Sequence, residues 1–61
     1  MNINEFAALK VGDRLTSMLG APGTVTEGDE RGIRVRWGEQ SDVTFFFSVN
    51  SRAWTHWNKI D

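Results

Sequence analysis

The side chains that could take part in acid–base or nucleophilic chemistry are few in this sequence and lie far apart. The single histidine, His56, lies between the tryptophans at positions 54 and 57. Nucleophilic catalysis needs a hydroxyl or thiol beside a base that a third group orients, and a lone histidine in an aromatic tail is more typical of packing. Carboxylates gather only in turn-like stretches, at 29–30 and 39–42, where solvated charge is the ordinary interpretation. The sequence therefore predicts no catalytic residue and a protein that is not an enzyme.

Metal and cofactor sites have little support either. Transition-metal sites combine several imidazole or thiolate ligands, and the chain has one histidine and no cysteine. The segment 28–32 is acidic where a phosphate-binding loop offers bare backbone amides. We expect no cofactor and no metal. One enzymatic alternative stays open, because copies of a small chain can build a shared site in a symmetric oligomer.

An alternation of period two marks the middle of the chain. In the segment 33–37 the odd positions are apolar, whereas the even positions carry Arg34 and Arg36. Side chains of an extended strand alternate between its two faces. The segment is therefore predicted to be a strand with an apolar inner face and a basic outer face.

The segment 43–49 shows the same alternation and holds three consecutive phenylalanines. Its odd positions are all apolar, which predicts Phe45 and Phe47 in the core together with the valines at 43 and 49. Phe46 then points toward the opposite face. We expect this strand to pair with the strand at 33–37.

Arg34, Arg36 and Phe46 would in that case share the outer face of two paired strands. Cross-strand neighbours are about 5 Å apart, so a guanidinium can lie on the Phe46 ring. Shielding of an exposed ring by arginine stems explains this arrangement without any function. The functional interpretation is a binding patch, because exposed aromatic and arginine side chains are typical of interaction hot spots.

The C-terminal tail could enlarge this patch. If residues 54–60 form a last strand, Trp54 and Trp57 have opposite parity, and we expect Trp57 inside and Trp54 partly outside, beside Arg52. A helical turn that joins positions 53, 57 and 60 is the alternative for this tail. The candidate binding residues are Arg34, Arg36, Phe46, Arg52 and Trp54.

The rest of the chain predicts short elements separated by glycine-rich turns. Asn4 predicts an N-cap for one or two helical turns, with Phe6 and Leu9 on one face and Gly12 at the end. A fifth strand is expected because it would close the sheet and remove its edges. The other predicted elements are a strand at 13–18, extended structure at 24–26, a hairpin loop of three to five residues within 28–32, a turn at 38–42, a 3₁₀ turn at 50–53 and a strand at 54–60.

Five short strands with a 3₁₀ turn before the last resemble the small SH3-like barrel. The resemblance is carried by the segments 9–15 (LKVGDRL), 23–26 (GTVT) and 33–38 (IRVRWG). This progression is similar to Tudor-type and KOW-type members of that fold. The resemblance implies an all-β, five-stranded SH3-like barrel with a short N-terminal helical turn and a 3₁₀ turn before the last strand.

The activities of those two groups do not transfer directly to this chain. Tudor-like readers of methylated side chains build an aromatic cage, partly from the loop between the first two strands. This chain has Met18, Leu19 and Pro22 there, and no tyrosine at all. KOW-like domains that hold RNA bring a basic loop, whereas the first hairpin here has only Arg14.

Length and charge narrow the classes of partner. The 61 residues predict one domain, 1–61, near the lower size limit for independent folding. The net charge of −1 gives no general attraction to nucleic acid or anionic lipid, although residues 31–61 are mildly basic. The apolar runs are far shorter than a membrane span, and the first residues lack a signal-peptide pattern. We expect a cytoplasmic protein that does not bind a membrane.

Two functional hypotheses use the same residues. The first is a non-enzymatic protein-interaction module that presents its aromatic and arginine patch to another protein, or to a second copy as a homodimer. The alternative is a nucleic-acid-binding small barrel, in which aromatics stack on bases while Arg34, Arg36, Arg52 and Lys59 hold phosphates. The overall acidity favours the first hypothesis, because affinity for phosphate backbones comes mainly from positive charge.

Overall fold

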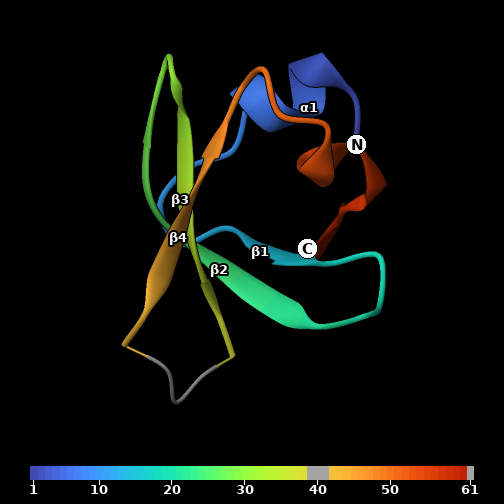
Figure 1. The fold of residues 1–61 in the computed structure, drawn as a ribbon, viewed down its shortest axis with the longest axis vertical. Helices are drawn as coiled ribbons and strands as arrows, with labels where there is room; N and C mark the ends of the chain where they lie inside the picture. The colour runs from blue at the N-terminus through green and yellow to red at the C-terminus, as the bar shows by residue number, and fades with distance from the viewer. Residues whose placement is uncertain (39–41, 61) are drawn as a thin grey trace.

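The protein is mostly β-structure, built around one five-stranded antiparallel sheet (Figure 1). A computed structural model describes residues 1–38 and 42–60. The strand order is β4-β3-β2-β1-β5. Within the described residues no pairing joins β4 to β5, so the sheet is open. The elements are α1 Ile3–Ala7, β1 Arg14–Thr16, β2 Pro22–Asp29, β3 Gly32–Trp37, β4 Thr44–Ser48, the 3₁₀ helix η1 Ala53–His56 and β5 Asn58–Ile60.

The N-cap of helix α1 lies two residues before the predicted one. Asn2 is the N-cap: its side-chain oxygen accepts a hydrogen bond from the Glu5 amide at 2.8 Å, and the Glu5 carboxylate accepts one from the Asn2 amide at 3.0 Å. This reciprocal capping box satisfies two amides that a helix start leaves unpaired. The prediction of Asn4 as the cap was therefore wrong, and the helix ends at Ala7, well before Gly12.

The hairpin between β2 and β3 is tighter than expected. Asp29 pairs with Gly32, which leaves a loop of two residues where three to five were predicted. The register shifts between Val25 and Glu27, so Thr26 is an extra residue on β2. Such a bulge bends its strand and increases the local twist. It also sets which β2 side chain lies opposite Val35, Arg36 and Trp37.

The core lies where α1 and the C-terminal segment meet the inner face of the sheet. Phe6 of α1 stacks on Trp54 of η1 with ring centroids 4.4 Å apart, and Figure 1 shows these two elements on the same side of the sheet. Each large apolar side chain buried in this way contributes about 1.5–3 kcal/mol. The buried apolar residues are Phe6, Leu9, Leu15, Val25, Ile33, Val35, Trp54 and Trp57.

The apolar face of β4 is only partly in the core. Phe47 packs edge-on against Trp57, with centroids 4.6 Å apart, and against Trp37 at 6.1 Å. Phe45 lies opposite the fully buried Val35, yet it is 53% exposed, and Val43 is exposed as well. The prediction that Phe45 and Val43 belong to the core was wrong, because the tryptophans cover the sheet at the Phe47 end.

The C-terminal tail combines the two forms that were weighed for it. A 3₁₀ helix precedes the last strand as predicted, but it spans Ala53–His56 rather than 50–53. The strand β5 is short, Asn58–Ile60, and pairs with β1. In the described part of the chain no helix has the length and apolar character needed to cross a membrane.

Candidate functional site

Arg34 and Phe46 lie directly opposite each other on β3 and β4, as the strand parity predicted. Both side chains are on the outer face of the sheet, away from the core. Phe46 is 49% exposed, and Arg34 is also exposed. The alternation of Ile33 and Val35 with Arg34 explains this placement, since the apolar neighbours turn inward and force the arginine out.

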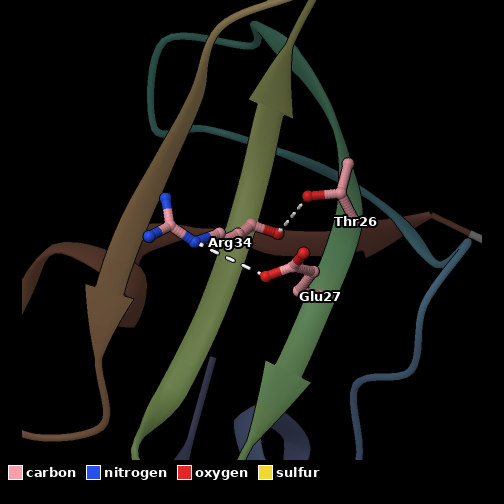
Figure 2. A network of polar contacts seen from close by, with 3 residues as sticks. All are labelled: Thr26, Glu27 and Arg34. Carbon is pink, nitrogen blue, oxygen red and sulfur yellow. Dashed lines mark hydrogen bonds and ion pairs between the residues drawn. The ribbon is translucent and has the colours of Figure 1, made fainter.

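Arg34 is oriented by contacts to β2 (Figure 2). Its Nε lies 3.6 Å from the Glu27 carboxylate, and its carbonyl accepts a hydrogen bond from the Thr26 hydroxyl at 3.4 Å. The ion pair is solvent-exposed, with side-chain exposures of 47% and 74%, so it adds only about 0–1 kcal/mol to stability. Its main effect is orientation. Figure 2 shows the guanidinium extending toward β4, with its Nε edge turned to Glu27.

A shallow depression of about 450 Å³ lies beside this pair. Gly32 forms part of its floor, and a side chain at Gly32 would overlap the backbone carbonyl of Phe47. The absence of a side chain there thus allows β3 and β4 to approach closely and leaves the surface hollow. The charged and aromatic side chains that line this depression are called the Arg34–Phe46 patch. They are Glu27, Asp29, Arg31, Arg34 and Phe46.

Arg36 and Arg52 occupy different surroundings from Arg34. Arg36 is on the outer face two residues further along β3, opposite Thr44, and it is half-buried. Its Nε is buried and has no hydrogen-bond partner among residues 1–38 and 42–60. Arg52 is exposed at the start of η1, where its carbonyl accepts a hydrogen bond from the Thr55 hydroxyl. Neither side chain lines the depression beside Phe46.

Trp54 does not belong to the exposed surface. It is 6% exposed, stacks on Phe6, and donates a hydrogen bond from Nε1 to the Ser48 carbonyl at 3.1 Å. The prediction that it lies partly outside was wrong because Trp54 is in η1, where the two-residue alternation of a strand does not apply. Trp57 is buried as expected.

Sequence reasoning missed the acidic half of the patch. Glu27 lay between the predicted extended segment 24–26 and the predicted loop within 28–32, and Asp29 lay in that loop, but the two-residue loop extends β2 to Asp29. Counting back across the two-residue loop pairs position 27 with position 34, whereas a three-residue loop at 29–31 would pair position 26 with it. The charge partner of Arg34 was therefore missed because the hairpin loop was predicted to be too long.

The described residues contain no group of three or more His, Cys, Asp or Glu side chains arranged to hold a metal ion. His56 is exposed on η1.

The chain matches no protein-family model, and no curated protein or solved structure is significantly similar to it. What can be said of function therefore depends on the geometry of the patch.

Proposed function

We propose that this chain is a non-enzymatic protein-interaction module of the SH3-like barrel type. The strand order β4-β3-β2-β1-β5, with η1 between β4 and β5, supports that architecture. The observation that carries the function is the pair Arg34 and Phe46, an exposed ring and an oriented guanidinium facing each other across two strands. Aromatic and arginine side chains of this kind dominate binding energy at protein interfaces.

The charge of the patch favours a protein partner over a nucleic acid. Glu27 and Asp29 lie in the same depression as Arg31 and Arg34, so cations and carboxylates are interspersed. A phosphate backbone would bring negative charge against those carboxylates, and nucleic-acid affinity rises with net positive charge. A protein surface can place a cation on Glu27 and a carboxylate or carbonyl on the forked donors of Arg34.

The direct test is the substitution Phe46→Ala with affinity for a captured partner as the readout. Proteins retained from a native-host lysate by the immobilised chain are identified by mass spectrometry, and the affinity of each is measured by calorimetry. We expect Phe46→Ala to weaken binding by more than about 1 kcal/mol while the thermal unfolding transition stays cooperative.

Leu19→Ala is the matched control for this experiment. Leu19 is another exposed apolar side chain, in the loop between β1 and β2, and it does not line the patch. Partner binding that survives Phe46→Ala, or that falls equally with Leu19→Ala, would show that the patch does not contribute to the interaction.

A titration with single-stranded and duplex oligonucleotides at two salt concentrations tests the alternative function, nucleic-acid binding. Strongly salt-dependent binding there would favour nucleic acid.

A further inference from the structure

The two edges of the sheet are protected to very different degrees. The edge strand β5 has three residues and carries Lys59, which forms an ion pair with Asp13 at 3.8 Å. The other edge strand, β4, has five residues, Thr44–Ser48, with no charge, proline or glycine among them. Sheet edges are normally blunted by short strands, charges or proline because their unpaired amides and carbonyls attract other strands. The β4 edge has none of these features.

The backbone groups of β4 that face outward follow from its register with β3. The Val49 amide donates to the Arg31 carbonyl at 2.8 Å. In an antiparallel ladder, residues alternate between hydrogen-bonding toward one neighbour and toward the other. Phe47 and Phe45 therefore bond to β3, whereas the amides and carbonyls of Ser48, Phe46 and Thr44 are directed away from it.

The surroundings of Ser48 support this alternation independently. Its carbonyl accepts hydrogen bonds from Nε1 of Trp54 and from the Ser51 amide, both in the segment that follows β4. That carbonyl thus points away from β3, as the alternation requires. Because this segment already occupies the Ser48 end of the edge, the accessible outward groups are those of Thr44 and Phe46.

We infer that β4 pairs with β4 of a second copy of this chain, antiparallel and with Phe45 on the two-fold axis. In this register Thr44 of each copy lies opposite Phe46 of the other, and the two residues exchange both backbone hydrogen bonds. The outward groups of Thr44 and Phe46 are symmetric about Phe45 along the strand. A two-fold axis at Phe45 therefore satisfies them on both copies with one repeated contact.

The exposure of Phe45 agrees with this arrangement. It lies on the core-facing side of the sheet, next to the buried Val35, yet half of its surface is in contact with solvent. On the two-fold axis it would face its own copy as a non-hydrogen-bonded pair, with Cα atoms about 4.5 Å apart. The apolar surface of Val35 and Phe45 would then continue across the seam into the second copy.

Charge and area are consistent with a weak, closed dimer. β4 is uncharged, and the nearest facing cations, Arg34 of one copy and Arg36 of the other, would be three strand spacings apart, about 14 Å. That separation exceeds the Debye length of about 10 Å at 0.1 M salt.

The area of the contact predicts a weak dimer. A standard interface covers about 800 Å² per partner, nearly a fifth of the 4379 Å² surface of this chain. One five-residue strand supplies less, which predicts a micromolar or weaker dimer. Growth stops at two copies because the other edge is the short, charged β5.

This inference goes beyond the proposed function, since the backbone edge and the Phe45 face carry it rather than the Arg34–Phe46 patch. The test uses wild-type sedimentation together with single-cysteine variants, which are unambiguous because the chain has no cysteine. We expect the sedimenting mass of the wild type to rise toward twice the monomer value between about 10 µM and 1 mM. Phe45→Cys should form a disulfide-linked dimer under mild oxidation.

Phe46→Cys is the matched control. Its two copies would be offset along the seam by about 8 Å between Cα atoms, beyond the 7 Å limit for a disulfide. We expect Phe45→Cys to cross-link at least about tenfold faster. A wild type that stays monomeric to about 1 mM overturns the inference. It is overturned in the same way if the β4 edge binds a peptide from another protein and not a second copy. Equal cross-linking of the two variants overturns the register. Partner binding tests the Arg34–Phe46 patch, through Phe46→Ala, and self-association tests the β4 edge, so the failure of one proposal is distinguished from the failure of the other.

Discussion

Phe45 and Phe47 lie on the same face of the same strand, two residues apart, and have different environments. Phe47 is enclosed edge-on by Trp37 and Trp57, whereas Phe45 is half exposed although its cross-strand neighbour Val35 is fully buried. Strand parity determines which face a side chain occupies. Whether that face is covered depends on other elements, here a tryptophan that follows η1. A small domain has too few such elements to cover a whole sheet.

The largest expected effect comes from removing the cover at the Phe47 end. Trp57→Ala deletes the ring that packs on both Trp37 and Phe47, and large-to-small changes of buried aromatics cost about 3–5 kcal/mol. A domain of this length has a total unfolding free energy of about 3–9 kcal/mol. We therefore expect much of the population to be unfolded at 25 °C. Circular dichroism during urea titration measures the unfolding free energy. A decrease of less than about 1 kcal/mol would mean that Trp57 does not account for the difference between the Phe47 end and the Phe45 end of β4.

The two phenylalanines themselves give the sharpest comparison. Phe47→Ala should lower the unfolding free energy by about 2–3 kcal/mol, because it leaves a cavity between two tryptophans. Phe45→Ala should lower it by less than about 1 kcal/mol, since half of that ring is already in contact with water. Denaturation is measured at low micromolar protein, where self-association does not contribute. Equal losses for the two variants would contradict the distinction drawn between the ends of β4.

Much of the sheet could be predicted from the sequence, but the environment of its aromatic side chains could not. The strict alternation of 33–37 and the phenylalanine run fixed β3, β4 and the facing pair Arg34 and Phe46. Trp54 was misplaced because its direction depends on a stacking contact with Phe6, almost fifty residues earlier in the chain. Contacts between distant segments leave no periodic signal in the sequence. The Asn2 cap, by contrast, has a local signal in its three-residue spacing to Glu5.

The smallest expected effect is at the exposed outer face. Glu27→Gln removes one charge of the Arg34 ion pair while keeping the shape of the side chain. We expect stability to change by less than about 0.5 kcal/mol, because both groups are well solvated. Thermal unfolding at low salt and at about 0.5 M salt should therefore nearly coincide for variant and wild type. A change above about 1 kcal/mol would show that the pair is more than an orienting contact.

The pairing of β1 with β5 affects how the chain folds. Two residues separate β2 from β3 and six separate β3 from β4, but Arg14 of β1 lies opposite Ile60 of β5, so 45 residues separate these two partners. Closing a loop of that length costs entropy before the contact stabilises anything. We expect the three-stranded meander to form first and the β1–β5 ladder to follow, so that this late closure governs the refolding rate.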